Sequence, residues 1–252
     1  MNGRFEHEGF DIAFIDEGAG EPVLLIHGFA SSAKVNWIST GWTGFLQASG
    51  YRVIAFDNRG HGQTSKSYRE EDYAPGLMAG DAAALLHHLG ISRTHVMGYS
   101  MGARIAAFVA LNFPELVQTV IFGGLGDGMF NGVGDWDPIA AALLSDAPET
   151  ISDPRGAAFR KFADQTHSDR RALAACIARS RQLVTPSQLG SIKAPALVGV
   201  GTNDDIAGSA QDLADAMRDA EAFDIAGRDH MLAVGDRSFK KSALEFLRSH
   251  PI

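Results

Sequence analysis

The sequence predicts an α/β fold: a mostly parallel sheet with helices on both of its faces. Short apolar runs rich in β-branched residues recur along the chain, and segments with helical spacing lie between them. The runs do not alternate strictly between apolar and polar residues, which is typical of strands buried on both faces. Alternating strands and helices indicate parallel strands joined by right-handed crossovers. The 252 residues suffice for one large domain or two small ones, and no interdomain linker divides them.

Six apolar runs are predicted to be strands. In chain order they span residues 23–26, 53–56, 95–97, 119–122, 196–200 and 222–225. Residues 77–89 carry apolar side chains at helical spacing, and Gly90 follows as a helix stop. The last predicted helix has an apolar face from Phe239 to Leu247, with Pro251 just beyond it.

The connection between the fourth and fifth predicted strands, from about residue 124 to 195, is far longer than a link from a helix to a strand needs. Three helix starts lie inside it, at Asp137-Pro138, Asp153-Pro154 and Ser168-Asp169. The first two pair a candidate N-cap with proline at the first helical position. We therefore predict a small helical cap, residues 125–190, inserted into a core formed by residues 1–124 and 191–252.

The composition is that of an ordinary globular protein, with 45% hydrophobic and 21% charged residues. The formal net charge of −8 argues against a nucleic-acid groove, which needs clustered Lys and Arg. The lone Cys176 excludes an internal disulfide and a cysteine-rich metal cluster. The first residues lack the pattern of a secretory signal, and no apolar run approaches the ~20 residues of a membrane helix. We expect a cytoplasmic protein without membrane insertion.

A serine stands between two glycines in Gly98-Tyr99-Ser100-Met101-Gly102, directly after the strand predicted at 95–97. A helical pattern begins at once, so the chain must turn from strand into helix without spare residues. Such a turn strains the serine backbone and exposes its hydroxyl at the carboxyl edge of the sheet, near the free N–H groups of the helix. The glycines remove side chains where helix and strand approach closely. The pattern predicts Ser100 as a nucleophile.

A serine is a weak nucleophile unless a base accepts its proton and a third group orients that base. His230 is the candidate base because it follows the last predicted strand, on a loop at the same edge of the sheet. The candidate acid follows the preceding strand, where Asp204 and Asp205 are adjacent. We favour Asp204 and expect Asp205 to cap a helix or to be solvated. Asp229 precedes the histidine, but adjacent residues rarely face each other well enough for this bond.

Acyl transfer also needs hydrogen-bond donors for the oxyanion. The Met101 backbone N–H, immediately after the nucleophile, is one candidate. The Phe29 N–H, in the loop after the first predicted strand, is the other, because Gly28 lets the backbone come close. His27 precedes the serine and is expected to be a buried histidine that holds this loop in shape.

Five motifs along the chain carry a resemblance to a known family. They are His27-Gly28-Phe29, Asp57-Asn58-Arg59-Gly60-His61-Gly62, Gly98-Tyr99-Ser100-Met101-Gly102, Gly201-x-x-Asp204 and the late His230. Together they span nearly the whole chain and resemble the α/β-hydrolase superfamily, in its serine esterase and lipase-like branch. The resemblance implies an eight-stranded, mostly parallel sheet with a cap after the sixth strand. It also supports Asp204 over Asp205 and implies a positioning role for the block at 57–62.

Two features set the chain apart within that superfamily. Its candidate nucleophile is serine, whereas haloalkane dehalogenases and epoxide hydrolases attack with aspartate, so those branches are disfavoured. The residue before the histidine is often small in the superfamily, but here it is Asp229. That carboxylate either tunes the imidazole or points to solvent.

The predicted substrate is a small molecule with an ester or related acyl group, and no cofactor or metal is expected. Candidate pocket residues are Met129, Phe130 and Trp136 at the start of the cap, and Met231 and Leu232 beside the base. A mainly apolar pocket favours small to medium acyl or aryl esters. Arginines in the cap leave a carboxylate-bearing substrate open; they are Arg155, Arg160, Arg170 and Arg171.

Three functions remain open on this basis. The first is a carboxylesterase that works through an acyl-enzyme. The second is a relative with the same triad that opens enol-lactones or cleaves carbon–carbon bonds of ring-cleavage products. The third is a ligand-binding signalling protein with a residual triad. The oligomeric state is open.

Overall fold

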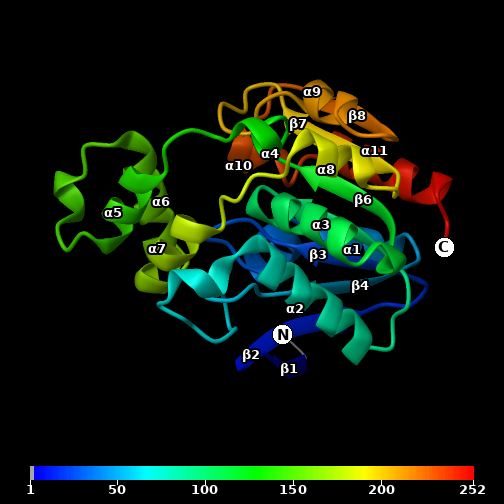
Figure 1. The fold of residues 1–252 in the computed structure, drawn as a ribbon, viewed down its shortest axis with the longest axis horizontal. Coiled ribbons are helices and arrows are strands. Elements are labelled where there is room, and N and C mark those ends of the chain that lie inside the picture. Colours follow the sequence, from blue (N-terminus) through cyan, green and yellow to red (C-terminus); the bar gives the residue numbers. More distant parts are fainter. Residues whose placement is uncertain (1–2) are drawn as a thin grey trace.

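The computed structural model describes residues 3–252, and an eight-stranded sheet runs through the molecule (Figure 1). The strand order is β1-β2-β4-β3-β5-β6-β7-β8. The strands are β1 (Gly3–His7), β2 (Phe10–Glu17), β3 (Glu21–Ile26), β4 (Tyr51–Phe56), β5 (Thr94–Tyr99), β6 (Val117–Gly123), β7 (Ala196–Gly201) and β8 (Ala220–Ile225). Strands β3 to β8 are parallel, whereas β2 is antiparallel to both β1 and β4. The predicted fold class is confirmed, and the six predicted strands are β3 to β8.

Eleven α-helices accompany the sheet within the described part of the chain. They are α1 (Trp42–Ala48), α2 (Pro75–His88), α3 (Met101–Asn112), α4 (Gly128–Asn131), α5 (Asp137–Leu144), α6 (Pro154–Gln165), α7 (Arg170–Arg179), α8 (Pro186–Ser191), α9 (Ala210–Asp215), α10 (His230–Ala233) and α11 (Arg237–Ser249). Helix α2 ends just before Gly90, whose φ of 67° is the left-handed conformation expected of a helix stop. No helix among residues 3–252 is both long and apolar enough to span a membrane.

Successive side chains of each central strand point to opposite faces of the sheet, and both faces are covered. On β3, Leu24 and Ile26 pack into the core shared with α2 and α3. Val23 and Leu25 pack into the second core, with α1 and α11. This two-sided burial explains why the strands read as continuous apolar runs rather than as alternating patterns.

The parallel register brings the carboxyl ends of several strands to one edge of the sheet. Ile26 at the end of β3 is level with Gly98 on β5, and Gly98 is level with Phe122 on β6. Gly201 at the end of β7 is level with Ile225 at the end of β8. The loops that follow β3, β5, β7 and β8 therefore start side by side, although they are far apart in the sequence.

The long connection between β6 and β7 carries helices α4 to α8. Helices α4 and α8 lie against the sheet, and α5, α6 and α7 lie together away from it, at the left of Figure 1. We call residues 136–179 the helical lobe. Before the lobe, the Gly126 and Gly128 amides donate to the Ala207 carbonyl of the core. The division of the chain at residues 125 and 190 stays a prediction.

Two of the three predicted helix starts in the insert are correct in detail. Asp153 caps α6 by accepting from the Gly156 amide, and Asp169 caps α7 by accepting from the amides of Arg171 and Ala172. The prediction that Asp137 is an N-cap is wrong, because α5 begins at Asp137 itself. The Asp135 carboxylate accepts from the Asp137 amide, and the Asp137 carboxylate pairs instead with Arg181 at 3.0 Å.

Candidate active site

Ser100 lies on the turn between β5 and α3, in a backbone conformation that L-residues rarely adopt, with φ 54° and ψ −114°. The neighbouring glycines are needed for packing. A Cβ on Gly98 would collide with the Gly102 carbonyl, and one on Gly102 would collide with the Ile26 carbonyl. The Ser100 amide donates to the Gly123 carbonyl at 2.7 Å, which holds the turn against β6. Close packing on all sides therefore maintains the strained serine.

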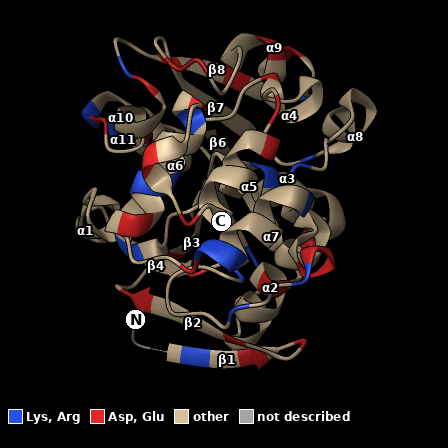
Figure 2. Cartoon of the chain, turned by 90° about the vertical axis from the view of Figure 1, so that its left-hand side faces the viewer, with Lys and Arg blue, Asp and Glu red and all other residues tan. Residues whose placement is uncertain are grey.

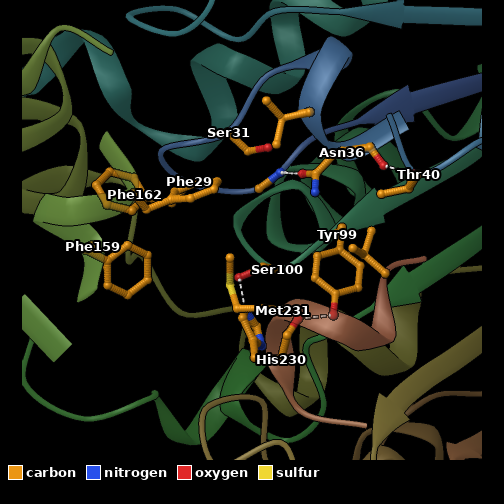
Figure 3. A pocket seen from close by; sticks show the side chains of 13 residues that line it. Phe29, Ser31, Asn36, Thr40, Tyr99, Ser100, Phe159, Phe162, His230 and Met231 are labelled. Atoms are coloured by element: carbon orange, nitrogen blue, oxygen red, sulfur yellow. Dashed lines mark hydrogen bonds between the residues drawn. The ribbon is translucent and has the colours of Figure 1, made fainter. Parts of the chain in front are cut away.

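Ser100, His230 and Asp204 form one line of hydrogen bonds (Figure 3 shows the bond between the first two). His230 Nδ1 lies 2.8 Å from Asp204 Oδ2, and His230 Nε2 lies 3.0 Å from Ser100 Oγ. An ionised carboxylate only accepts hydrogen bonds, so Nδ1 carries the imidazole proton. Nε2 is then free to accept from the serine hydroxyl. The three predicted residues thus come together from the loops after β5, β7 and β8.

The structure distinguishes the two adjacent aspartates. The side chain of Asp204 is fully buried, and its Oδ1 accepts from the amides of Ile206 at 2.9 Å and Ala207 at 3.0 Å. Its other oxygen is thereby directed at His230. Asp205 is exposed to solvent. Among the two, only Asp204 contacts the imidazole.

The position of His230 is set by neighbours on both sides. The Tyr99 hydroxyl donates to the His230 carbonyl at 2.6 Å, a contact that the sequence did not reveal. Asp229 is the N-cap of α10, and its Oδ1 accepts from the amides of Met231 and Leu232. The Asp229 carboxylate therefore starts the short helix that carries the histidine, and the residue is exposed to solvent, which is one of the two alternatives that the sequence left open.

The two predicted oxyanion donors, the backbone amides of Phe29 and Met101, have no acceptor among residues 3–252. The Met101 N–H is the first of α3, where helix geometry leaves it free. Gly28 brings the other amide close, since a Cβ there would lie 3.4 Å from the Ser100 Cβ. The Asn36 side chain accepts from the Gly28 amide at 2.7 Å and thereby fixes the loop.

Buried histidines support this loop from behind. His27 lies between the Gly28 carbonyl, 2.7 Å from Nδ1, and the Asn58 amide, which donates to Nε2 at 2.9 Å. Complete burial lowers the pKa of His27 to about 4. Burial and the adjacent His27 lower the pKa of His61 to about 3. Both imidazoles are therefore neutral at pH 7, and His27 has the loop-holding role that the sequence predicts.

Two cavities meet at Ser100 and Phe29. The larger has a volume of about 230 Å³ (Figure 3). Its walls are formed by Gly28, Phe29, Ser31, Val35, Asn36, Thr40, Tyr99, Ser100, Phe159, Phe162, His230, Met231 and Val234. The smaller has a volume of about 40 Å³ and is lined by Phe29, Ser100, Met101, Arg104, Leu125, Val133, Trp136, Ile177, Ser180, Arg181 and Ile206.

The predicted pocket residues divide between these cavities and other places. Met231 lines the larger cavity and Trp136 the smaller. Met129, Phe130 and Leu232 line neither, so their assignment to the pocket wall is corrected. Met129 is fully buried, Phe130 packs against the main core, and Leu232 is 58% exposed on α10.

Two aromatic residues of the larger cavity were missed by sequence reasoning. Phe159 and Phe162 project from α6 of the lobe into this cavity. The Phe159 ring lies 5.6 Å from the Phe29 ring and 5.5 Å from the Trp136 ring. The lobe thus closes the site with an aromatic cluster. No group of three or more His, Cys, Asp and Glu side chains among the described residues is arranged to hold a metal ion.

Similarity to known proteins agrees with this geometry. The chain is 39% identical to the Mycobacterium tuberculosis protein BpoC over 111 residues, which are 44% of this chain and 40% of BpoC. It therefore spans less than half of that relative. It superposes with a TM-score of 0.80 on a hydrolase from Pseudomonas aeruginosa (22% identity, 97% of each chain). The esterase EaEST from Exiguobacterium antarcticum also gives 0.80 (19% identity, 96% of this chain and 97% of that one).

The two superpositions show a shared fold. A family model described as the alpha/beta hydrolase fold matches residues 21–160, which is more than half of the chain. That range includes the loop at Gly28 and Phe29, the block at 57–62 and the turn at Ser100. The resemblance stated from the motifs is confirmed, and the chain belongs to the alpha/beta hydrolase fold family.

Proposed function

We propose that this protein is a serine hydrolase that cleaves small to medium carboxylic esters through an acyl-enzyme on Ser100. The observation that carries the proposal is the hydrogen-bonded line from Asp204 through His230 to Ser100. It ends beside two amides, those of Phe29 and Met101, that have no other acceptor among the described residues. Nucleophile, base, orienting acid and oxyanion donors are thus assembled at one point.

The reaction follows from these positions. Ser100 Oγ attacks the ester carbonyl carbon while its proton moves to His230 Nε2. Asp204 stabilises the imidazolium, and the amides of Phe29 and Met101 donate to the oxyanion. The carbon–oxygen bond to the alcohol then breaks, and His230 gives its proton to the departing oxygen. Water repeats the attack on the acyl-enzyme with His230 as base, which releases the acid and restores the serine.

The free amides matter energetically because they need no reorganisation when charge develops. Removing one such donor from an oxyanion hole costs on the order of 10²–10³ in kcat. Ser100 lies at the N-terminus of α3, whose dipole also favours negative charge. These features favour acyl transfer over ligand binding alone.

The cavity sets the size of the substrate. At about 230 Å³ the larger cavity lies below the usual range of about 300–1,000 Å³ for small-molecule pockets. Phe29, Phe159 and Phe162 make much of its wall apolar. Short acyl or alcohol groups fit this space better than long chains. The similarity to EaEST, which is named an esterase, accords with this class of substrate.

The test is a series of 4-nitrophenyl esters, acetate, butyrate and octanoate, followed by absorbance. We expect turnover of the acetate and butyrate and a lower kcat/KM for the octanoate. Ser100→Ala should abolish turnover and leave the Tm within a few degrees of the wild-type value. Ser187→Ala, which changes an exposed serine on α8, serves as the matched control and should retain full activity. If no ester is hydrolysed, or if Ser100→Ala stays active, the proposal is wrong.

A further inference from the structure

A buried cation lies within one helical turn of the candidate nucleophile. Arg104 is on α3, four residues after Ser100, and its side chain lines the smaller cavity together with Ser100 and Met101. Only 4% of the residue is exposed. It is the sole charged residue of α3, whose other buried positions are apolar or glycine. A charge in this place needs a physical explanation, because burying an unpaired ion is costly.

The protein only partly compensates this charge. Arg104 Nη1 donates to the carbonyls of Met129 at 2.8 Å and Gln182 at 3.1 Å, and Nη2 donates to the carbonyl of Gly128 at 3.1 Å. A guanidinium has five N–H donors, so two have no acceptor among residues 3–252. No carboxylate of the described chain pairs with it. Burial lowers the pKa of Arg104 only to about 10, which leaves it positive at neutral pH.

A second arginine lines the same cavity. Arg181 forms an ion pair with Asp137 at 3.0 Å, but Asp137 is 81% exposed and Arg181 34% exposed, so this pair is open to solvent. The buried residue Ser180, which directly precedes Arg181, also lines this cavity and adds a hydroxyl to its wall. The smaller cavity therefore has two cations and a hydroxyl on its wall.

The four lobe arginines considered from the sequence have other roles and line neither cavity. Arg155 lies 4.9 Å from the Trp136 ring centre, and Arg171 lies 4.3 Å from the Tyr68 ring centre. Arg160 pairs with Asp164 at 2.9 Å, so basic and acidic residues lie side by side on α6 (Figure 2). Arg170 donates to the carbonyls of residues 143 and 145. Unlike these four, Arg104 and Arg181 line a cavity that Ser100 also lines.

Which part of an ester would reach Arg104 follows from the proposed function, on which this inference rests. His230 must protonate the departing alcohol, and it lines the larger cavity but not the smaller. The alcohol therefore leaves on the side of the larger cavity. The acyl group then extends toward the smaller cavity and Arg104.

We propose that the smaller cavity is a carboxylate subsite and that the substrates are monoesters of short dicarboxylic acids. Its volume of about 40 Å³ exceeds the roughly 10–15 Å³ that a single water molecule needs in a cavity, so it has room for one small polar head group. A carboxylate there accepts from the two free N–H groups of Arg104 and supplies the missing counter-charge. Charge-assisted bonds of this kind are about twice as strong as neutral ones.

The test compares two esters of nearly equal shape, ethyl hydrogen succinate and ethyl 4-methylpentanoate, in which an isopropyl group replaces the carboxylate. Hydrolysis is followed by acid release in a pH-stat. We expect the wild type to prefer the succinate monoester in kcat/KM by at least about tenfold. Arg104→Met and Arg104→Lys should lose this preference, the first more completely, and Arg181→Met should reduce it. Arg171→Met, on the lobe surface, should leave it unchanged.

The outcomes separate a binding role from a structural one. If Arg104→Met slows both esters equally, Arg104 only anchors the insert and the subsite is refuted. The same follows if the wild type cleaves both esters equally well, and then the proposed hydrolase function still stands. If neither ester is cleaved, calorimetry decides: ethyl hydrogen succinate must bind the wild type and ethyl 4-methylpentanoate must not. Should Arg104→Met fail to fold, inhibition of wild-type 4-nitrophenyl acetate hydrolysis by succinate, and not by the uncharged succinamide, is the required result.

Discussion

The sheet core and the helical lobe both reach Ser100, but they do so by different means. The core contributes the ends of β5, β7 and β8, where backbone hydrogen bonds, forced glycine positions and two buried layers fix each atom. The lobe contributes side chains alone, chiefly the rings of Trp136, Phe159 and Phe162. At the site, the lobe contacts the core through the Phe159 ring, 5.6 Å from the Phe29 ring, and through the Cys176 sulfur, 3.7 Å from the Met101 sulfur.

This difference separates two properties of the protein. The reacting atoms, which must be placed to a fraction of an ångström, lie on the sheet core, where backbone hydrogen bonds determine their positions. The side chains that select a substrate lie on the helical lobe, where side-chain packing tolerates changes of size and shape. The reaction class and the choice of substrate are therefore expected to respond to different mutations, and each prediction below tests that separation.

The largest effect is expected in the core, at the orienting acid. Asp204→Asn should lower kcat by about 10⁴-fold, because the amide removes the negative charge opposite His230 and favours the wrong imidazole tautomer. Asp205→Asn, next to it and exposed, should change stability and activity by no more than about 0.5 kcal/mol. Steady-state kinetics with 4-nitrophenyl butyrate measures both. Equal losses in the two variants would contradict the assignment.

The next effect concerns acid sensitivity, which we expect to reside in the core. In the folded protein the pKa values of His27 and His61 are about 4 and about 3, below the ordinary imidazole value of 6.5. Between these values and pH 6.5, both histidines are protonated in the unfolded chain but not in the folded protein. The unfolded state therefore binds more protons, and the free energy of unfolding falls as pH falls from about 6.5 to about 4. The slope is about 1.4 kcal/mol per pH unit for each histidine.

Urea denaturation between pH 7 and pH 4.5 measures this slope. His61→Phe removes one titrating group and should reduce the slope of the unfolding free energy against pH by the contribution of one histidine. The Trp136→Phe variant retains Trp37 and Trp42, which lie in the core, so its fluorescence follows the core without the lobe. A slope that is unchanged in His61→Phe would show that the acid sensitivity arises elsewhere.

A mutation in the lobe should change selectivity instead of chemistry. Phe159→Ala removes one aromatic wall of the larger cavity. The ratio of kcat/KM for the octanoate to that for the acetate should rise by about 10- to 100-fold, the range for one to several methylenes in an apolar pocket. Leu144→Ala, at an exposed lobe position, is the control and should leave the ratio unchanged. A collapse of kcat on the acetate in Phe159→Ala would break the separation drawn above.

The smallest effect is expected at the helix caps of the lobe. Asp153→Ala removes the cap of α6 and should cost about 1 kcal/mol of stability. Asp137→Ala removes only the solvent-exposed partner of Arg181, which is worth between about 0 and 1 kcal/mol. Thermal unfolding followed by circular dichroism compares the two. A larger loss in Asp137→Ala would mean that the ion pair holds the lobe more firmly than the cap does.

What could be predicted from the sequence follows the same division. Ser100, Asp204 and His230 were found because parallel strands end at one edge, so residues that follow those strands must meet. Phe29 and Met101 followed from the loops on either side of that point. These inferences used strand direction, chain order and the glycine–serine motif, and the resemblance to the superfamily supported Asp204 over Asp205.

The residues that were missed are those whose position depends on tertiary packing. Nothing in the pattern around Phe159 and Phe162 shows where α6 will lie, and the start of the insert was chosen for the pocket wall instead. Met129 and Phe130 do belong to the insert, but α4 packs against the core. Arg104 had a readable signal, a single charge in an otherwise buried helix after the nucleophile.

The contacts of Arg104 also bear on how the lobe is attached. The guanidinium joins carbonyls before the lobe, at Gly128 and Met129, to one after it, at Gln182, and the Val184 amide donates to the Met129 carbonyl. The chain therefore leaves and returns through a narrow neck. Beyond that neck, the lobe contacts the core through side chains, with Phe159 on Phe29 and Asp169 accepting from the Tyr68 hydroxyl. A lobe grafted from another member of the family would therefore have to match the neck carbonyls and also pack against these core residues.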